Sequence, residues 1–471
     1  MMCDYVRLQG IKIENFKNVK FGEIDFMNSR KNFKSSILGL YGQNGSGKTT
    51  LIDAIELLKN ALCNRSIPHY FLDYINVDSD YSHLSYRFAI YRDEGEYLVN
   101  YSFKLKKQKS ENYDENNQNT YMYDVKIYDE IIGYSFRSEE QKINYATLIN
   151  TNTEDVFIPA TKYNTLIGKD KNIKVDLLVA KKLSYKMSKS FIFSPDLLNY
   201  IEKGIKDGNK SSIRHFNLLQ RLRQFGFHEL FIINTKDTSL ISLNALPLSF
   251  KVDKKNGGQH ASGHLMLSLD DAFVIPNREE QMVKKIIECM NIVLNQLIPG
   301  LIIDVRELGK ELIKDELEGV RIQLVSLKNG KEIPLKYESE GIKKIISILQ
   351  LLIVVYNKKQ ITVAIDELDS GIFEYLLGEI LRIISEKGKG QLIFTSHNLR
   401  PLETLDRGFI AFTTTNPSNR YIRMSNIKDN NNLRDFYFRD IIVGDQKENL
   451  YDLTNNSEIS YAFRKAGKYD D

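Results

Sequence analysis

Residues 41–50 read YGQNGSGKTT, a loop with three glycines that ends in a lysine and two threonines. Glycine adopts positive φ at no steric cost, so Gly42, Gly45 and Gly47 allow several backbone N–H groups to turn inward around phosphate oxygens. The loop is therefore predicted to bind the phosphates of a nucleotide.

The polar side chains of this loop have distinct predicted roles. Lys48, taken as an exposed loop lysine, is expected to reach the β- and γ-phosphates, and the Thr49 hydroxyl is expected to bind Mg²⁺. The predicted nucleotide-binding residues of the loop are Gly42, Asn44, Gly45, Ser46, Gly47, Lys48, Thr49 and Thr50.

The flanking sequence supports this interpretation over that of a flexible Gly/Ser loop. Residues 37–41 form a short apolar run typical of a buried strand, and the apolar residues after the loop recur at helical spacing, namely Leu51, Ile55, Leu58 and Leu62. The loop thus joins a strand to the N-terminus of a helix, where the helix dipole favours an anion.

A second apolar strand, ITVAIDELDSG at 361–371, ends in carboxylates. Asp366 suits the second coordination shell of the Mg²⁺ on a bound nucleotide, and Glu367 suits a general base or a group that orients water for attack on the γ-phosphate. The alternative is an acidic N-terminus for the following helix. Lys48 and Asp366 are far apart in the sequence, which indicates an interrupted catalytic domain.

Two further stretches complete the predicted site. QLIFTSHNL at 391–399 is an apolar strand that places His397 at its C-terminal end, where ligands of open α/β sheets bind. We interpret His397 as a sensor of the γ-phosphate, although a lone histidine is more often structural. YESEGIKKIISILQLL at 337–352 places Ser339 and Gly341 at the start of a helix, again a favourable position for an anion.

The order of these elements resembles the ABC-type ATPase heads of the SMC, RecF and OLD-like families. More closely it resembles the stand-alone AAA-type ATP-binding proteins of bacterial antiphage (abortive infection) systems. The matching stretches are IKIENFKNV as the opening strand, GQNGSGKTT as Walker A, ESEGIKK as the signature, VAIDELDSG as Walker B with the D-loop, and FTSHN as the switch histidine. The resemblance covers roughly residues 5–100 and 275–415.

The resemblance implies an α/β fold: an ABC-type P-loop NTPase head with an antiparallel β subdomain and an inserted, mainly helical lobe. It also implies ATP and Mg²⁺ as ligands, hydrolysis to ADP and phosphate, and a head-to-tail homodimer or larger homo-oligomer. In such a dimer, the signature residues Ser339 and Gly341 and the D-loop residue Asp369 would contact the nucleotide of the other head. Only Ser339 and Gly341 match the transporter-type signature LSGGQ. The glutamine of the family's Q-loop has no clear counterpart, and Gln108 is only a candidate.

Three functions are compatible with these motifs. The first is a nucleotide-driven sensor or switch that acts with a separate effector, such as a nuclease, in antiphage defence. The second is a RecF-like ATPase that clamps DNA during repair. The third is a module that holds ATP with negligible turnover.

The rest of the chain indicates how these motifs are organised. The first forty residues and the stretches 85–92 and 97–106 are predicted to form antiparallel strands, whereas the polar stretch 106–120 is predicted to be a surface loop. Residues 196–225 and 282–298 are predicted to be helical. We expect three units, which are residues 1–104 with Walker A, a largely helical insertion at 105–274, and residues 275–471 with the remaining motifs.

The amino-acid composition is that of an ordinary globular protein. The chain has 471 residues, 42% of them hydrophobic and 27% charged, with a net charge of +4, which neither requires nor excludes nucleic acid. Cys3, Cys63 and Cys289 are too scattered for a metal cluster and are typical of reduced thiols. The most apolar predicted helix, 345–356, is shorter than the ~20 residues of a membrane span. We expect a cytoplasmic protein with no membrane association.

Several other features of the sequence are weaker indications of function. Residues 169–189 carry seven lysines, and Arg214, Arg221 and Arg223 follow; this surface could bind nucleic acid or be a solvated helical face. His260 and His264 have metal-like spacing but no nearby carboxylate pair, so a zinc site is not expected. Asp78-Ser-Asp80 is interpreted as a turn. Too few residues follow His397 for a Toprim nuclease domain, so a nuclease activity is expected in a partner.

Overall fold

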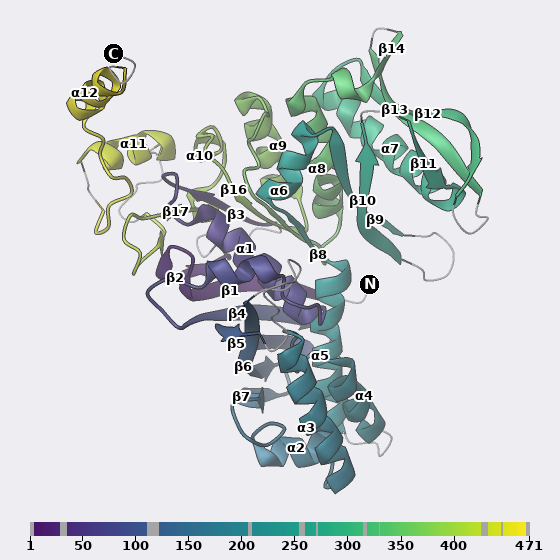
Figure 1. The fold of residues 1–471 in the computed structure, drawn as a ribbon, viewed down its shortest axis with the longest axis vertical. Coiled ribbons are helices and arrows are strands. Elements are labelled where there is room, and N and C mark those ends of the chain that lie inside the picture. The colour runs from purple at the N-terminus through teal and green to yellow at the C-terminus, as the bar shows by residue number, and fades with distance from the viewer. Residues whose placement is uncertain are drawn as a thin grey trace.

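The structure, a computed structural model, describes residues 4–28, 35–110, 122–205, 210–253, 260–269, 272–313, 318–328, 330–424, 432–443 and 446–467. Cys3, most of the predicted polar loop and Asn329 lie outside these ranges. Within them the chain combines a parallel sheet, a large antiparallel sheet and helices that cover both (Figure 1). The predicted α/β class is confirmed.

The parallel sheet holds the phosphate-loop strand at its centre, in the order β18-β17-β3-β16-β15-β8. All neighbouring strands run parallel except β18, which is antiparallel to β17. The strands are β3 (Ser36–Tyr41), β8 (Leu230–Ile233), β15 (Thr362–Ile365), β16 (Gln391–Thr395), β17 (Ile410–Thr413) and β18 (Tyr421–Ile422). The strands predicted at 37–41 and 361–365 are confirmed.

This sheet is buried on both faces, which explains why its strands are apolar throughout rather than alternating. Successive residues of β3 face opposite cores: Leu38 and Leu40 belong to one cluster, and Ile37 and Tyr41 to the other. The sheet therefore separates two hydrophobic cores, and the ends of its strands are fixed from both sides.

The antiparallel sheet builds one of these cores. Its order is β2-β1-β4-β5-β6-β7, which confirms the predicted antiparallel pairing of the N-terminal strands. The strands are β1 (Tyr5–Phe16), β2 (Val19–Asp25), β4 (Tyr81–Arg92), β5 (Gly95–Lys109), β6 (Tyr123–Arg137) and β7 (Lys142–Asn150).

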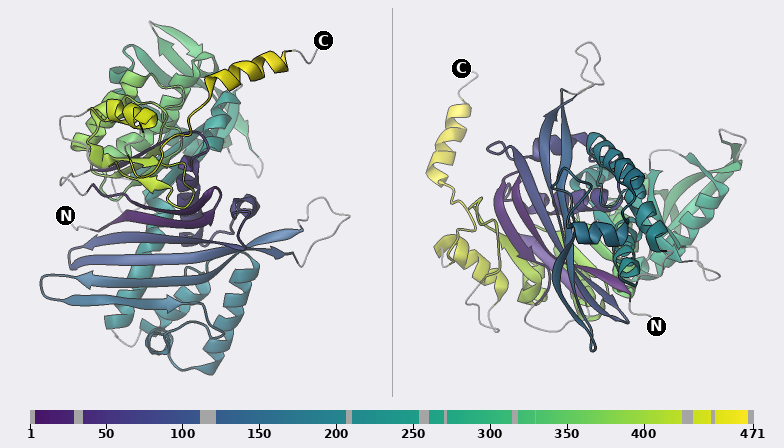
Figure 2. Two further views of the ribbon diagram at one scale, coloured as in Figure 1. Left: turned by 90° about the vertical axis from the view of Figure 1, so that its left-hand side faces the viewer. Right: turned by 90° about the horizontal axis from the view of Figure 1, so that it is seen from below.

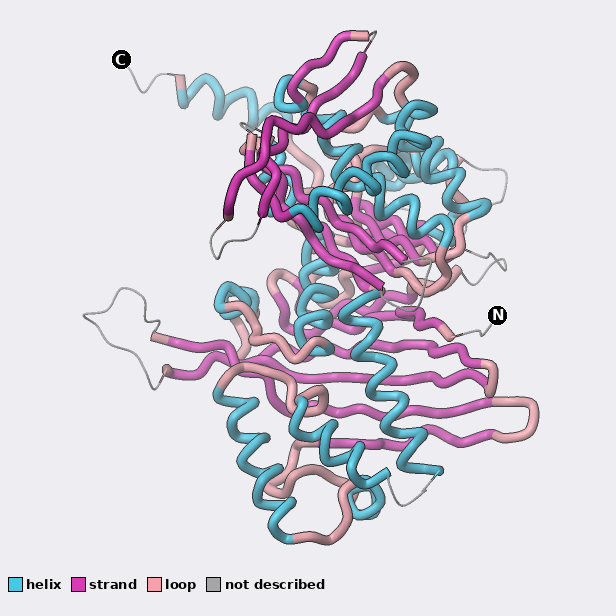
Figure 3. The backbone as a smooth tube through the Cα atoms, turned by 90° about the vertical axis from the view of Figure 1, so that its right-hand side faces the viewer, coloured by secondary structure: helices cyan, strands magenta, loops and turns pink. Residues whose placement is uncertain are grey.

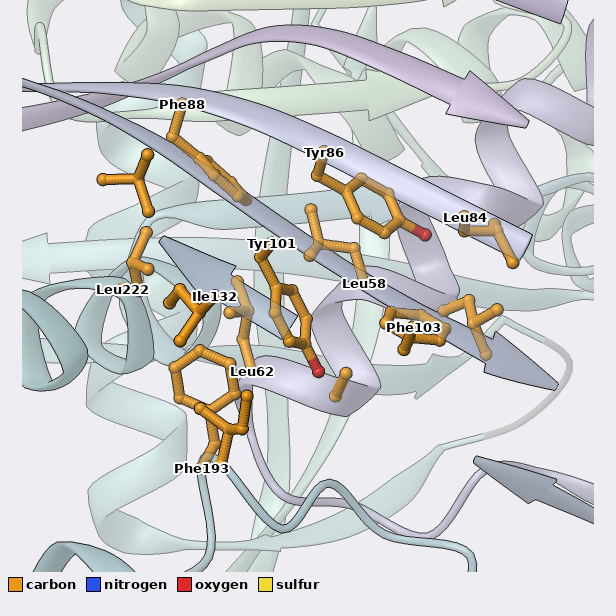
Figure 4. Packing of buried hydrophobic residues seen from close by; sticks show 14 of the residues in the cluster. Leu58, Leu62, Leu84, Tyr86, Phe88, Tyr101, Phe103, Ile132, Phe193 and Leu222 are labelled. Atoms are coloured by element: carbon orange, nitrogen blue, oxygen red, sulfur yellow. The ribbon is translucent and has the colours of Figure 1, made fainter. Parts of the chain in front are cut away.

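Helix α1 (Lys48–Leu62) lies between the two sheets. Its residues Leu58 and Leu62 pack among the aromatic side chains of the antiparallel sheet, including Tyr86, Tyr101 and Phe103 (Figure 4). The helix that follows the phosphate loop is thus anchored in a core, so its N-terminus is held in one place.

Further helices cover the same face of the antiparallel sheet on which α1 packs (Figure 3). They are α2 (Ala160–Leu166), α3 (Lys171–Lys186), α4 (Pro195–Gly204) and α5 (Lys210–His228), preceded in the chain by the 3₁₀ helix η1 (His69–Tyr74). The helical prediction for 196–225 is confirmed in α4 and α5.

The second core lies on the other side of the parallel sheet. Its helices are α6 (Thr235–Ser242), α7 (Asn277–Leu297), α8 (Glu340–Asn357) and α9 (Glu374–Lys387). Its strands are β9 (Ala245–Asp253), β10 (His260–Ser268), β11 (Phe273–Pro276), β12 (Leu301–Leu312), β13 (Glu318–Lys328) and β14 (Lys331–Pro334), followed by the 3₁₀ helix η4 (Leu335–Tyr337).

The predicted hairpin is confirmed, because β13 pairs with β14 and Gly330 has a φ of 73°. The helix predicted at 282–298 is also confirmed by α7, which ends at Leu297 before Pro299.

The expected division of the chain differs from the structure at the insertion. The boundary between residues 104 and 105 falls inside β5, and residues 105–274 also contain β6, β7, β8, β9 and β10. The insertion therefore holds strands beside the predicted helices. Long-range strand pairing decides this outcome: β6 extends the N-terminal sheet, and the four-residue β8, too short to show a period, pairs with β15.

The C-terminal residues lie beside the parallel sheet. They contain α10 (Pro401–Thr404), η5 (Arg407–Phe409), α11 (Leu433–Val443) and α12 (Asn456–Ala466). Helix α12 stands clear of the body (Figure 2). Among the described helices, none has both the length and the apolar character needed to cross a bilayer.

Candidate functional site

The phosphate loop follows β3 and leads into α1, as predicted. The Lys48 ammonium donates to the carbonyl oxygens of Gly42, at 2.8 Å, and Gln43, at 2.9 Å. Lys48 is only 6% exposed, so the expectation of an exposed loop lysine is wrong. The reason is that Lys48 begins a helix whose first turn is enclosed by the loop itself, a feature invisible in the local sequence.

Each glycine of the loop is required for its own structural reason. Gly42 has a φ of 152°, and a Cβ there would lie 1.8 Å from the Thr413 hydroxyl oxygen at the end of β17. Gly47 has a φ of 94° and precedes α1, whereas Gly45 has a φ of 74° and faces open space. Gly42 is thus required by close approach, and Gly45 and Gly47 by backbone conformation.

Asp366 is fixed at the end of β15 by two hydroxyl groups. Thr235 Oγ1, from the first turn of α6, donates to Asp366 Oδ2 at 2.8 Å, and Thr395 Oγ1, at the end of β16, donates to Asp366 Oδ1 at 2.5 Å. The carboxylate is fully buried. Its remaining lone pairs are oxygen donors of the kind that Mg²⁺ prefers.

Glu367 follows in an unusual backbone conformation. Its φ is 48°, in the left-handed region, and its N–H donates to Thr395 Oγ1 at 2.8 Å. Non-glycine residues held in this region mark strained positions that cluster at active sites. Thr395 therefore holds both neighbouring acidic residues, one through its proton and the other through its oxygen.

His397 and Asp369 are linked through the backbone. The N–H groups of His397 and Asn398 donate to Asp369 Oδ2 at 3.1 and 2.9 Å. The imidazole of His397 is exposed. Partial burial and the nearby Lys48 charge lower the pKa of His397, which favours the neutral ring, and a neutral ring can donate or accept a hydrogen bond.

Buried lysines balance the charge of these carboxylates. Burial lowers the pKa of Lys48, and the carboxylates of Asp366, Glu367 and Asp369 oppose this shift. Lys344 of α8 is 2% exposed; burial lowers its pKa to about 8, against the pull of the same three carboxylates. Lys344 ends the stretch ESEGIKK, but no role was predicted for it, since its surroundings depend on where α8 packs.

A cleft of about 1020 Å³ connects these groups. Ligand pockets typically occupy ~300–1,000 Å³, so the cleft is large enough for a nucleotide. The predicted site residues that line it are Asn44, Gly45, Gly47, Lys48, Thr49, Thr50, Asp366, Glu367, Asp369 and His397. The donor set fits a nucleotide with Mg²⁺: an ammonium group and loop amides for phosphates, and the oxygens of Thr49 and Asp366 for the metal.

Four predicted residues do not line the cleft. Gly42 and Ser46 lie behind the loop, where both approach Thr413. Ser339 caps α8 through a bond from the Ile342 N–H at 3.3 Å and is exposed. A Cβ on Gly341 would lie 2.1 Å from the carbonyl oxygen of Gly371, so Gly341 is required by packing within the same chain.

Sequence reasoning missed one wall of the cleft. The turn after β1 contributes Lys17 and Asn18, and η1 with the residues after it contributes Asp73, Ile75, Asn76 and Val77. Their only local signal is backbone conformation, because Asn15 and Lys17 have φ values of 55° and 52°. These segments are brought to the phosphate loop by the antiparallel sheet, which no short motif encodes.

Other predicted features have clear outcomes. Asp78 lies in a turn, where its N–H donates to Asn76 Oδ1 at 3.0 Å, so that prediction is confirmed. Gln108 lies outside the cleft and accepts a hydrogen bond from the Tyr185 hydroxyl, so it is no Q-loop residue. Among the described residues, no group of three or more His, Cys, Asp or Glu side chains is placed to hold a metal ion. The side chains of His260 and His264 lie outside the described set.

The predicted basic surface is only partly present. Lysines of 171–186 lie on α3, but Arg221 is 4% exposed and pairs with Asp4 and Glu229 inside the protein. Arg221 is therefore structural.

Cys63 is buried and Cys289 is exposed, and both are free thiols.

Comparisons with known proteins identify a family for this chain. A family model described as "AAA ATPase domain" matches residues 7–400. No curated protein matches the sequence.

Solved structures with similarity to the chain include the SMC head domain from Thermotoga maritima, at 13% identity over 89% of this chain and 100% of that chain, with a TM-score of 0.37. An Smc head domain bound to the C-terminal domain of ScpA, from Pyrococcus furiosus, aligns at 11% identity over 89% and 96% with a TM-score of 0.36. The recombination mediator RecF aligns at 15% identity over 84% and 94% with a TM-score of 0.32.

Proposed function

The chain belongs to the AAA ATPase domain family, and on that basis we propose that it binds ATP with Mg²⁺ and hydrolyses it to ADP and phosphate. Its α/β fold is that of a P-loop ATPase. One observation supports the proposal above all others: a single cleft brings Lys48 and Thr49 together with Asp366, Glu367 and His397, although these residues come from distant parts of the chain.

Each of these residues has a proposed role in this cleft. The Lys48 ammonium exchanges its bonds to loop carbonyls for bonds to phosphate oxygens, and Thr49 and Asp366 supply oxygens for Mg²⁺. Mg²⁺, when bound, neutralises charge that develops on the phosphates. The Glu367 carboxylate takes a proton from the attacking water, and the neutral His397 ring donates to the γ-phosphate.

We further propose that ATP joins two copies head to tail. Ser339 and Gly341 lie outside the cleft of their own chain, and Ser339 is exposed at the N-terminus of α8. The N-terminus of a helix favours an anion. In the proposed dimer this end of α8 and the segment around Asp369 face the nucleotide of the other copy, so ATP binding and hydrolysis switch the assembly between two states.

The proposed biological role is that of a switch for a separate effector, such as a nuclease, in bacterial antiphage defence. Infection assays test this role. Bacteria that carry the gene with its neighbours are expected to form fewer phage plaques, and Lys48→Ala should restore plaque formation; unchanged plaque counts between the two would reject it.

Steady-state ATP turnover, measured as phosphate release with and without duplex DNA, tests the biochemical proposal. We expect slow turnover of roughly 1 s⁻¹ or less, at the low end for enzymes, that requires Mg²⁺ and changes little with DNA. Strong stimulation by DNA would instead favour a RecF-like clamp. Bound ATP without turnover would favour a module that only holds the nucleotide.

A further inference from the structure

Helix α12 has no surface of its own to pack against. All of its residues are exposed, and it stands clear of the body in Figures 1 and 2. Its N-terminus is well formed, since the Asn455 side chain accepts bonds from the N–H groups of Ser457 and Glu458. An isolated helix shorter than ~12–15 residues is marginal in water. A capped but unsupported helix of 11 residues therefore suggests a surface on another molecule.

One side of α12 is apolar. Ile459, Ala462, Phe463 and Ala466 recur at the i, i+3, i+4, i+7 spacing of a helix face that packs against a partner. Phe463 is 77% exposed. Tyr461, which is 66% exposed, lies on the opposite side of the helix, because two residues correspond to about 200° of rotation.

The segment before α12 is fixed to the body, so the helix projects from a defined place. Leu450 is buried, the Thr415 N–H donates to the Asn449 carbonyl oxygen at 2.8 Å, and the Asp452 N–H donates to Gln43 Oε1 at 2.9 Å. Gln43 belongs to the phosphate loop. Helix α12 thus begins four residues after a contact with that loop.

A second unpartnered apolar surface lies at the opposite end of the molecule (Figure 1). Helix α3 packs on the antiparallel sheet through Leu177, Ala180 and Ser184. Its outer side carries a row of apolar residues spaced four apart, each more than half exposed, namely Val175, Val179, Leu183 and Met187. Because α3 and α12 of one chain lie at opposite ends, α12 would meet this row on another copy.

The charges beside the two apolar surfaces are complementary when the helices run antiparallel. With Ile459 opposite Leu183 and Phe463 opposite Val179, Glu458 lies near Lys182 at one end. Arg464 lies near Asp176 at the other end.

The two charged pairs also lie on matching sides of the two helices. At 100° per residue, Glu458 and Arg464 flank the α12 stripe on opposite sides, as Lys182 and Asp176 flank the α3 row. When two antiparallel helices face each other, each acidic residue then falls on the same side as its basic partner. A parallel arrangement would place Glu458 toward Asp176, so antiparallel packing is the favoured one.

From these observations we propose that α12 of one copy packs antiparallel on α3 of a second copy. The contact is separate from the nucleotide cleft and requires no ATP. Because α12 has only 11 residues, we expect the contact to bury less than the ~1,200 Å² of a stable interface, so association through it alone should be weak and depend on protein concentration. Where the ATP-dependent contact also forms, the two contacts reinforce each other through a raised effective concentration.

Sedimentation velocity of the full chain without nucleotide, over a range of concentrations, tests this proposal. Wild type is expected to self-associate, and Phe463→Ser and Val179→Asp should each weaken association at least about tenfold, as the loss of a central apolar contact does. Tyr461→Ser is the matched control, since it removes another well-exposed aromatic ring from the other side of α12 and should leave association unchanged. A wild-type protein that stays monomeric, or association insensitive to Phe463→Ser, would overturn the proposal.

Charge-reversal variants test whether the surface that α12 contacts is α3 of a second copy. Glu458→Lys and Lys182→Glu should each weaken association several-fold, and the double variant should recover it, because the pair is then restored with opposite polarity. A carbodiimide cross-link between Glu458 and Lys182, found between isotope-labelled and unlabelled chains, would place the contact between copies. If instead Lys182→Glu impairs binding of duplex DNA while self-association is unaffected, α3 binds nucleic acid and the proposal fails.

Because the test is done without nucleotide, its outcome is independent of the ATPase proposal. Loss of self-association in Phe463→Ser with normal ATP turnover would support the α12 contact alone. Normal self-association with no ATP turnover would reject the ATPase and leave the α12 contact standing.

Discussion

Lys48→Ala is expected to abolish ATP binding, with an affinity loss of at least about 100-fold. A buried ammonium beside a phosphate makes charge-assisted hydrogen bonds whose removal costs ~2–5 kcal/mol. Because Lys48 also bonds to the carbonyl oxygens of Gly42 and Gln43, the variant should lose ~1–3 kcal/mol of stability as well. Binding is measured with a fluorescent ATP analogue, and stability by thermal unfolding.

Lys59→Ala is the matched control for this loss of stability. Lys59 lies near the other end of α1, outside the cleft, and donates to the carbonyl oxygen of Leu230 at 2.8 Å. Its removal should lower the unfolding temperature without changing ATP affinity. If folded Lys48→Ala protein binds ATP as wild type does, the nucleotide site is assigned wrongly.

Glu367→Gln is expected to bind ATP but reduce turnover at least about 100-fold, since general-base catalysis contributes ~10²–10⁴. The amide keeps the size of the side chain and the strained backbone position but cannot accept the proton. ATP should then persist and hold two copies together in an ATP-dependent state visible by sedimentation. Glu374→Gln, an exposed change in the first turn of α9, is the control and should hydrolyse normally.

The proposed contact between the N-terminus of α8 and the other copy's phosphate can be tested in the Glu367→Gln variant. Ser339→Asp keeps a good helix cap but places a carboxylate where the other copy's phosphate is proposed to lie, whereas Ser339→Asn keeps the cap without the charge. Only Ser339→Asp should abolish the ATP-dependent state of Glu367→Gln. Gly341 is unsuitable for this test, because any side chain there meets Gly371 within its own chain.

Mixing two defective proteins gives an independent check on shared sites. A head-to-tail dimer of Lys48→Ala and Ser339→Asp retains one intact composite site, so partial recovery of turnover is expected. Normal hydrolysis and association by Ser339→Asp alone would mean that each copy works by itself.

The hydrophobic patterns of the sequence determined the elements around the phosphate loop. A short apolar run with a glycine-rich loop and an amphipathic helix has few alternatives, because glycine conformations and helix periodicity are local properties. The same holds for the apolar strands that deliver Asp366 and His397. These predictions needed no knowledge of which strands pair.

Tertiary structure alone decided which remote residues complete the cleft and which are buried. Thr235 and β8 come from the stretch expected to be a helical insertion. In the structure β8 pairs with β15, and Thr235 donates a hydrogen bond to Asp366. Lys48 and Lys344 proved buried, and Gly341 proved to be fixed by Gly371, because the packing of α1 and α8 sets their surroundings. Local sequence specifies backbone conformation and periodicity, whereas burial and long-range strand pairing depend on contacts between segments that no local pattern encodes.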